Sequence, residues 1–319
     1  MATGLADREL LRMHTHRGRL VLATTVLGSG LALLDGTIVN VALPTIGREL
    51  HASLAGLQWV VNAYALTLAS LILLGGSLGD RFGRRRIYAV GVTGFAIASI
   101  GCALAPTIEV LVAARAIQGI CAALLVPGSL AILQASFHHD DRMAAIGAWT
   151  GLLGVATASG PIVGGWLVER SWTWAFWVNV PLAALVVIMA LRVVPESWNP
   201  HASKEFDLVG VALAVVGLGA LTWGLTVSSD GNRLVPLTVG LVGVVALGAL
   251  AMWEQRSRHP LVPPSLFRNR VFTTINLVTL LVYAGLSGAI LFLVMFLQTV
   301  AGWSALAAGS ATLPLSIVM

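Results

Sequence analysis

Residues 76–86 read GSLGDRFGRRR and lie between two long apolar segments. Five charged residues and a tight-turn glycine in so short a stretch are typical of a loop that joins two membrane-spanning helices. Gly83 can supply a backbone conformation that other residues resist, and Asp80 can accept charge-assisted hydrogen bonds. The four arginines hold this end of the hairpin at the cytoplasmic surface. An ordinary positive loop would explain the arginines, but not Gly76, Asp80 and Gly83 at this spacing.

The composition of the whole chain also indicates a membrane protein. Among its 319 residues, 57% are hydrophobic and 10% are charged, and the mean hydropathy is +0.88. An ordinary soluble domain of this length does not reach such values. The formal charge of +5 and the pI near 10.0 would suit a protein that binds nucleic acid. However, the basic residues are dispersed among short loops and are not gathered on one domain, as nucleic-acid binding requires. We therefore expect a lipid bilayer as partner and no nucleic acid.

Ten apolar runs are each long enough to cross a hydrocarbon layer ~30 Å thick as a helix. They lie near residues 20–43, 57–79, 87–106, 110–133, 143–168, 173–194, 208–228, 235–253, 272–298 and 303–319. The predicted fold class is an all-α integral membrane protein. The last run has no flanking loop, because the sequence ends inside it.

The basic residues are divided unequally between the two sides of the predicted membrane. Of 19 Lys and Arg residues, 15 fall on the side of the amino-terminal tail, and Arg115 lies within a span. Only Arg48, Arg170 and Arg233 fall on the other side. The positive-inside rule therefore predicts a cytoplasmic amino terminus. We expect the tail, residues 1–19, to be retained, since the apolar run after it is too long for a signal peptide.

Two opposite charges are predicted inside the membrane. Asp35 lies in the first apolar run, and a carboxylate at this depth is a functional hypothesis by default; a buried acid that fixes helix packing is the alternative. At ~1.5 Å per residue, Asp35 lies about 12 Å and Arg115 about 9 Å below the outer ends of their predicted helices. We expect both to face one cavity in the outer half of the membrane. Asp35 is the best candidate proton carrier, because all seven histidines fall in tails or loops.

The fifth apolar run is rich in small residues. Gly160 and Gly164 have the spacing that lets another helix approach closely, and Gly165 follows directly. Pro161 removes a backbone hydrogen bond and favours a kink. The pattern predicts a helix-packing seam, or a bent helix that forms a tight seal against the leakage of ions.

Motifs for other chemistry are absent from the sequence. It contains no phosphate-binding loop with Lys-Ser or Lys-Thr, which argues against a nucleotide-driven pump. It contains no zinc-type histidine pair and no nucleophile elbow. We therefore expect no enzyme, no catalytic residues, no metal and no cofactor.

Together these motifs resemble the 14-helix drug:proton antiporter branch of the major facilitator superfamily, along essentially the whole chain. Residues 76–86 resemble the superfamily's loop signature, and residues 115–119 its helix-four motif. Residues 160–165 resemble the antiporter motif, and residues 35–44 resemble the helix-one motif of the 14-helix branch.

The resemblance implies a role for each motif. Proton coupling or substrate binding would fall to Asp35, Arg115 and Gln118. A cytoplasmic gate would be formed by Gly76, Asp80, Arg81, Gly83, Arg84 and Arg85. Leakage would be blocked by Gly160, Pro161, Gly164 and Gly165.

It also implies a division of the chain. Residues 1–19 would be the cytoplasmic tail and residues 20–194 a six-helix bundle. Residues 195–271 would form a linker with two additional transmembrane helices, and residues 272–319 the start of a second bundle. About 10 of an expected 14 helices are then present, so the sequence looks truncated at its carboxyl end, as a fragment or as a shortened protein.

The implied function is secondary active export, from a bacterial inner membrane, of lipophilic compounds in exchange for protons, driven by the proton gradient. The carboxylate of Asp35 is the main argument that these compounds include cations. Two alternatives stay open: an antiporter dedicated to one metabolite or self-made antibiotic, and a non-transporting membrane partner with the same fold. The motifs specify neither the substrate nor the oligomeric state.

Overall fold

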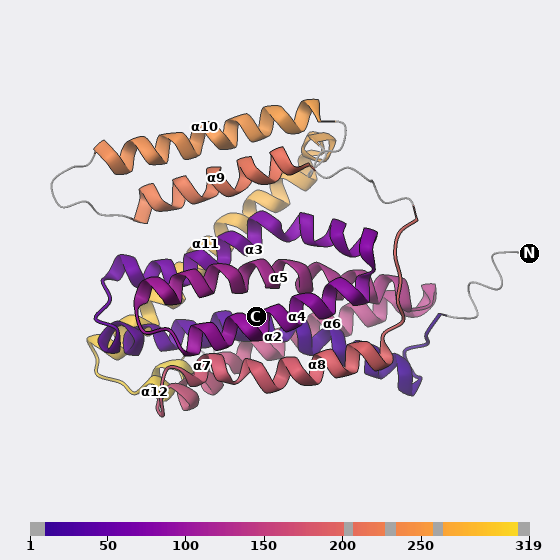
Figure 1. Ribbon diagram of the computed structural model, residues 1–319, viewed down its shortest axis with the longest axis horizontal. Helices are drawn as coiled ribbons and strands as arrows, with labels where there is room; N and C mark the ends of the chain where they lie inside the picture. The colour runs from indigo at the N-terminus through magenta and orange to yellow at the C-terminus, as the bar shows by residue number, and fades with distance from the viewer. Residues whose placement is uncertain (1–9, 201–206, 227–233, 258–263, 312–319) are drawn as a thin grey trace, which may run out of the picture.

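The computed structural model describes residues 10–200, 207–226, 234–257 and 264–311, and it is helical in nearly all of these ranges (Figure 1). Nine helices in this part of the chain are long and apolar enough to cross a membrane. They are α2 (His16–Glu49), α3 (Leu54–Phe82), α4 (Arg84–Ala103), α5 (Ile108–Ser136), α6 (His139–Val168), α7 with α8 (Trp174–Trp177 and Asn179–Val193), α9 (Leu208–Thr226), α10 (Leu234–Arg256) and α11 (Arg270–Thr299). The described chain also contains two short elements, η2 (Pro264–Arg268) and α12 (Ala305–Ser310).

The predicted all-α class is therefore confirmed, with nine of the ten predicted runs present as spanning helices. The tenth run begins as α12, and its residues beyond 311 lie outside the described part of the chain. The ends of the helices differ from the apolar runs. For example, α2 includes Pro44 and continues to Glu49 rather than stopping near residue 43. Apolarity marks the part of a helix that suits hydrocarbon, whereas hydrogen bonding at the caps decides where the helix ends.

Hydroxyl side chains mark the beginnings of several helices. Thr15 accepts a hydrogen bond from the Gly18 amide at 3.1 Å at the start of α2, and Ser53 accepts one from the Gly56 amide at 3.2 Å at the start of α3. Such caps satisfy amides that have no partner within the helix and contribute about 1 kcal/mol each. The sequence thus sets the helix starts locally, before any tertiary packing is considered.

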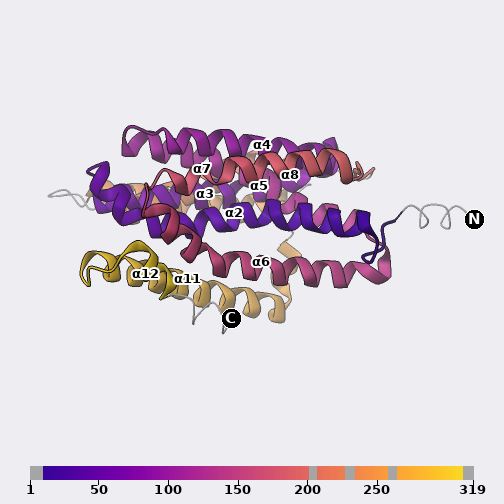
Figure 2. The same cartoon turned by 90° about the horizontal axis from the view of Figure 1, so that it is seen from below.

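Helices α2 to α8 pack together around two apolar cores (Figures 1 and 2). The first core lies along residues 21–32 of α2 and includes Tyr88 and Phe95 of α4. The second lies along residues 38–46 of α2 and includes Leu111 of α5. Asp35 therefore falls on α2 between the buried apolar stretches of the two cores.

Helices α9 and α10 pack against each other, and α9 also packs against α3 (Figure 1). Glycines permit the close approach: a Cβ on Gly217 would lie 2.8 Å from Leu247, and one on Gly224 would lie 2.7 Å from the carbonyl oxygen of Pro236. Asp207 ties the pair at one end, since it accepts hydrogen bonds from the Gly210 amide at 2.7 Å and from Trp253 Nε1 at 2.8 Å.

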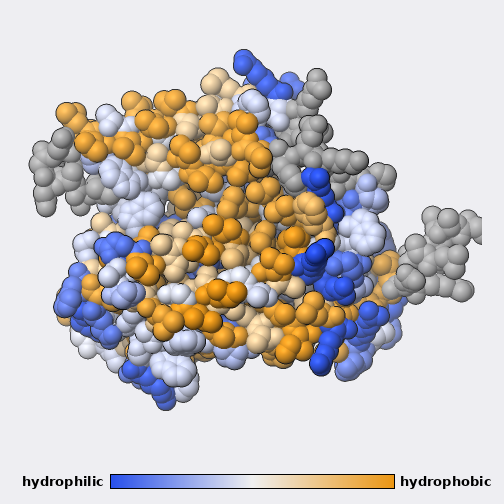
Figure 3. Space-filling view, viewed as in Figure 1, coloured by the Kyte–Doolittle hydropathy of each residue, from blue (hydrophilic) through white to orange (hydrophobic). Residues whose placement is uncertain are grey.

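The last described helices lie beside α2 and α6 (Figure 2). Helix α12 packs on α6, while α11 contacts α2 and buries only Val294 among its described residues. Gln298 donates a hydrogen bond to the carbonyl oxygen of Val41 at 3.1 Å. Figure 3 shows apolar side chains over the middle of the visible face, with hydrophilic ones mainly toward its two ends. This banding suits a bilayer.

Candidate functional site

Asp35 is the centre of a buried polar network. Its side chain has no exposed surface. Arg115 Nη1 donates to its Oδ2 and forms an ion pair with it. Its Oδ1 accepts hydrogen bonds from Gln118 Nε2 at 3.0 Å and from Asn179 Nδ2 at 2.8 Å. A deprotonated carboxylate only accepts hydrogen bonds, so these three donors match the charged form of Asp35.

Arg115 is buried, with its side chain 1% exposed, and it makes hydrogen bonds and aromatic contacts as well as the ion pair. Its Nε donates to the carbonyl oxygen of Val60 at 3.1 Å, and its Nη1 donates to Gln118 Oε1 at 2.6 Å. The guanidinium carbon lies 4.2 Å from the centre of the Tyr64 ring and 5.9 Å from that of Phe176. A cation over an aromatic face is attracted by about 0.5–2 kcal/mol. The aromatic rings therefore add to the attraction of the Asp35 carboxylate.

Ser99 completes the network from α4. Its hydroxyl oxygen accepts from Gln118 Nε2 at 2.8 Å and from Asn179 Nδ2 at 3.3 Å. We call Asp35, Ser99, Arg115, Gln118 and Asn179 the Asp35 network. Its members come from α2, α4, α5 and α8, so a change of charge at Asp35 acts on four helices at once.

The predicted pairing of Asp35 with Arg115 is confirmed, but the cavity that both were predicted to face is not seen in this conformation. With exposures of 0% and 1%, the two side chains leave no surface for water. The amides of Gln118 and Asn179 fill the space beside the carboxylate. Water or substrate therefore reaches Asp35 only after the helices around it move apart.

Sequence reasoning did not include Ser99, Tyr64 or Asn179 in the site. The run near 173–194 was predicted as one helix and forms one span, Trp174–Val193; a single turn residue, Val178, whose backbone stays in the helical region, separates α7 from α8, and Asn179 is the first residue of α8. Pro181 is tolerated so close to the start of a helix because the amide it lacks has no partner there. This span places the side-chain amide of Asn179 beside Asp35. The available signal was Asn179, two residues before Pro181, inside an apolar run.

Residues 76–86 were predicted as a loop but are almost entirely helical: α3 continues to Phe82, α4 begins at Arg84, and Gly83 alone forms the tight turn between them. Asp80 pairs with Arg84, at 2.7 Å from Nη2 and 2.8 Å from Nε. Gly83 has φ +105°, which side chains disfavour, and a Cβ there would lie 2.9 Å from the Glu196 carboxylate carbon. The predicted special backbone at Gly83 is confirmed.

The chain that follows α8 crosses this loop. Glu196 Oε1 accepts from the Arg85 amide at 3.0 Å, and Glu196 Oε2 lies 3.6 Å from Arg85 Nε. The Ser197 carbonyl oxygen accepts from the Arg84 amide at 2.9 Å, and the Asn199 amide donates to the carbonyl oxygen of Asp80 at 2.8 Å. Sequence reasoning missed this strap, because nothing in residues 194–199 resembles a partner for the loop.

The two remaining predicted loop residues are Gly76 and Arg81. Gly76 lies within α3, where a Cβ would be 3.6 Å from the Pro127 ring of α5. The Arg81 guanidinium lies 5.1 Å from the centre of the Phe82 ring. The role of all six residues as a gate stays a prediction.

The glycines of α6 form two seams. A Cβ on Gly160 would overlap Thr37, and one on Gly164 would lie 3.0 Å from Ile38 Cα, so this side of α6 meets α2 beside Asp35. A Cβ on Gly165 would lie 2.5 Å from Leu306 Cα on α12. The carbonyl of Pro161 also faces α12, close to Gly309. The predicted packing seam is confirmed, whereas a role against leakage stays a prediction.

The α2–α6 seam can be tested with a matched pair of valine substitutions. Gly160→Val forces a side chain into Thr37, and we expect it to lower the stability of the protein by about 1–3 kcal/mol, as overpacking does. Gly154→Val places the same side chain on the same helix where nothing lies within 4 Å. Thermal unfolding of both purified variants checks this. Equal melting temperatures would contradict the seam.

The fold and the Asp35 network define the class of protein. It is a multi-pass helical membrane protein with a buried ion pair among helices α2 to α8. The chain belongs to the Major Facilitator Superfamily, whose family model matches residues 25–319.

Several curated relatives are named for resistance or efflux. The chain is 35% identical to the tetracenomycin C resistance and export protein of Streptomyces glaucescens, over 93% of this chain and 56% of the relative. It is 39% identical to the multidrug resistance protein Stp of Mycobacterium tuberculosis over the same shares. It is 36% identical to the multidrug efflux pump LfrA of Mycolicibacterium smegmatis, over 95% of this chain and 60% of the relative. The chain thus spans somewhat more than half the length of these relatives.

Solved structures agree with the fold. A mutant of the peptide transporter POT in complex with sulfate superposes with a TM-score of 0.59 at 15% identity, over 81% of this chain and 57% of the other. At this identity the likeness concerns the fold alone.

Proposed function

We propose that the protein is a secondary active transporter that exports lipophilic compounds, cations among them, in exchange for protons. The observation that carries the proposal is the buried state of Asp35. Asp207 and Glu254, the other buried carboxylates of the described chain, each keep 9% of their surface exposed, whereas Asp35 keeps none. A carboxylate in this setting is costly and calls for a function. Membership of the superfamily and the names of the relatives support transport.

The Asp35 network supports a coupling mechanism. Protonation of Asp35 removes the charge that Arg115 pairs with, so the ion pair weakens and the four helices of the network are free to separate. A cationic substrate that then reaches the site competes with the proton for the same carboxylate. Substrate binding therefore releases the proton, and this exchange couples the two movements. Arg115 and Gln118 act in this scheme by stabilising the charged form of Asp35 while the site is closed.

We also propose the placement of the chain in the membrane. The end that carries residues 76–86, the last turn of α8 with Arg192, and the end of α10 with Arg256 is here called the arginine-rich end. The excess of basic residues supports a cytoplasmic location for this end, in a bacterial inner membrane. Residues 20–194 form the first bundle, α9 and α10 form the linker pair within residues 195–271, and α11 begins a second bundle.

A narrower function is the second candidate. Some relatives are named for single antibiotics, such as the puromycin resistance protein of Streptomyces alboniger, 39% identical to this chain. A transporter dedicated to one metabolite or antibiotic would use the same coupling through Asp35, so the two candidates differ only in the range of substrates.

Efflux from cells that express the complete gene tests the proposal. We expect energised cells to expel a lipophilic cationic dye several-fold faster than vector controls, and an uncoupler to abolish the difference. Tolerance to one antibiotic without dye efflux would favour the narrower candidate. If neither efflux nor tolerance appears, with the protein confirmed in the membrane, the export function is wrong.

A further inference from the structure

A groove runs along the surface of the bundle between α4 and α8, and it begins at the arginine-rich end. It has a volume of about 770 Å³, within the ~300–1,000 Å³ of small-molecule sites. Its α4 wall includes Arg86, Val90 and Ile97, and its α8 wall includes Val187 and Leu191. Residues spaced by four or seven lie on one face of a helix, so each helix contributes one continuous face. The described lining includes no member of the Asp35 network.

The apolar walls of this groove face lipid. Val90 is 54%, Ile97 65% and Leu191 58% exposed, and all three lie in helices that can span the membrane. Figure 2 shows α4 and α8 on the side of the bundle away from α11 and α12. By helical rise, Arg86 and Ile97 lie roughly 16 Å apart along α4, about half of the ~30 Å hydrocarbon layer. The groove therefore has the length of one leaflet.

Two arginines of α4 give the groove a positive end. Arg85 and Arg86 both line it. The carboxylates nearby are engaged by other residues, since Asp80 pairs with Arg84 and Glu196 with Arg85. Arg86 is exposed and forms no ion pair with a described residue. Two arginines against one glutamate leave the described lining with a net positive charge.

Glu196 is held by local bonds that leave Arg86 available. Its Oε1 accepts hydrogen bonds from the amides of Arg85 at 3.0 Å and Ser197 at 3.1 Å, and its Oε2 lies 3.6 Å from Arg85 Nε. A guanidinium binds phosphate through paired, charge-assisted hydrogen bonds. The long stem of Arg86 can lie along the apolar wall while its charge stays at the level of the lipid headgroups. A ligand that matches this arrangement has an anionic end and an apolar chain.

We propose that this groove binds an anionic phospholipid from the leaflet at the arginine-rich end, with its phosphate at Arg86 and an acyl chain along Val90, Ile97 and Leu191. Basic residues between transmembrane helices at the membrane surface are a known form of headgroup site. A lipophilic cation fits the apolar walls, but Arg86 repels its charge. The inference goes beyond the proposed export function, because it concerns a bound lipid and holds whether or not the protein exports anything.

Native mass spectrometry of the purified complete protein, titrated with phosphatidylglycerol or with phosphatidylcholine of the same acyl chains, tests the charge. We expect the wild type to bind phosphatidylglycerol at least about fivefold more tightly, because Arg86 repels the choline ammonium group. Arg86→Gln removes most of this preference, since a charge-assisted contact is lost, and Arg86→Lys keeps part of it. Arg19→Gln removes an exposed arginine at the start of α2, outside the lining, and keeps the wild-type preference.

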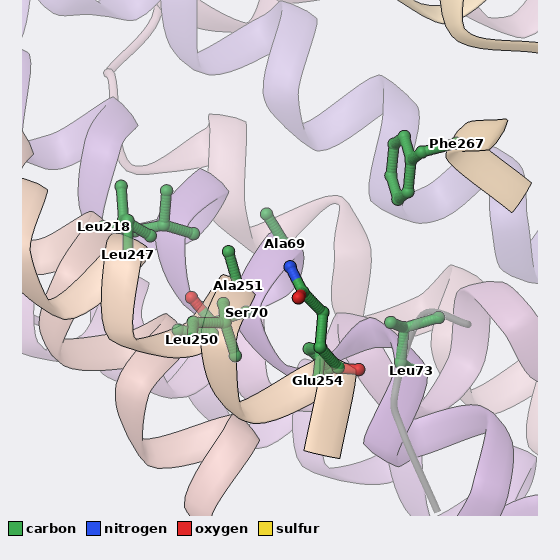
Figure 4. Close-up of a pocket in the computed structure, with 11 residues that line it drawn as sticks. Ala69, Ser70, Leu73, Leu218, Leu247, Leu250, Ala251, Glu254 and Phe267 are labelled. Carbon is green, nitrogen blue, oxygen red and sulfur yellow. The ribbon is translucent and has the colours of Figure 1, made fainter. Parts of the chain in front are cut away.

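A second pair of variants tests the place of binding. Val90→Trp fills the groove where the acyl chain would lie, and we expect it to abolish the preference for phosphatidylglycerol. Ala251→Trp puts a tryptophan into a different pocket, which Ala69, Leu218 and Leu247 line between α3, α9 and α10 (Figure 4). We expect this control to bind both lipids like the wild type. Melting temperatures confirm that each variant is folded.

Four results would overturn this assignment. They are equal affinities of the wild type for the two lipids, the wild-type preference in folded Arg86→Gln or Val90→Trp, an equal loss in Arg19→Gln and Arg86→Gln, and a loss in Ala251→Trp alone. The third would show a general attraction by the basic surface, and the fourth would move the lipid to the pocket beside α3. The readout is independent of transport, so a lipid preference carried by Arg86 without energised efflux retains this site and refutes the export function.

Discussion

Arg115→Leu is expected to lower the free energy of unfolding by about 3–5 kcal/mol, the usual cost of removing one partner of a buried ion pair. The substitution leaves the charge of Asp35 buried and removes donors from Gln118 Oε1 and the Val60 carbonyl oxygen. Chemical denaturation of the purified protein, monitored by a spectroscopic signal that reports on the helix bundle, measures the loss in the free energy of unfolding.

An exposed arginine provides the control. Arg12 pairs with Asp140 at 3.1 Å, with side chains 40% and 68% exposed, and such surface pairs contribute about 0–1 kcal/mol. We expect Arg12→Leu to have little effect. We also expect the double variant Asp35→Asn/Arg115→Leu to recover part of the loss, because no uncompensated charge remains. If Arg115→Leu unfolds like Arg12→Leu, the buried pair does not exist in the protein.

Asp35→Asn is expected to reduce dye efflux from energised cells to the level of the vector control, a loss of at least about tenfold. The amide keeps the size of the side chain but does not exchange a proton at neutral pH. We expect Asp35→Glu to keep part of the activity, since it retains the carboxylate.

Asp140→Asn is the matched control for this prediction. It makes the same chemical change at an exposed carboxylate of α6, and we expect efflux to stay near that of the wild type. Membrane levels of all variants are compared by immunoblot. Full efflux in Asp35→Asn at a normal protein level would exclude Asp35 as the coupling residue.

Physical rules for membranes explain how far the site was predictable. A charge within an apolar run must find a partner in the same layer, and helical rise places Asp35 and Arg115 at similar depths. Their contact could therefore be predicted from one sequence. Ser99 and Asn179 could not, because small uncharged polar residues are common in spans and their partners depend on how the helices rotate. The closed state of the site follows from that packing as well.

The spanning helices were predictable for a different reason. Hydrocarbon thickness fixes the length of an apolar run, so nine spans appear where hydropathy placed them. The division between α7 and α8 at Val178 does not change the hydropathy of the span and was missed. Contacts across long separations were also missed: Glu196 reaches Arg85, and Glu254 faces α3, only once the bundle has formed.

Proton movement in membrane vesicles tests the central claim most directly. Everted vesicles with an acidic lumen, prepared from cells expressing the complete gene, are given a lipophilic cationic dye while lumenal pH and dye uptake are recorded together. We predict that the wild type accumulates the dye and raises lumenal pH faster than vesicles without the protein, and that Asp35→Asn does neither. Gradient-driven accumulation of the dye by Asp35→Asn at the wild-type rate would contradict proton-coupled export through Asp35.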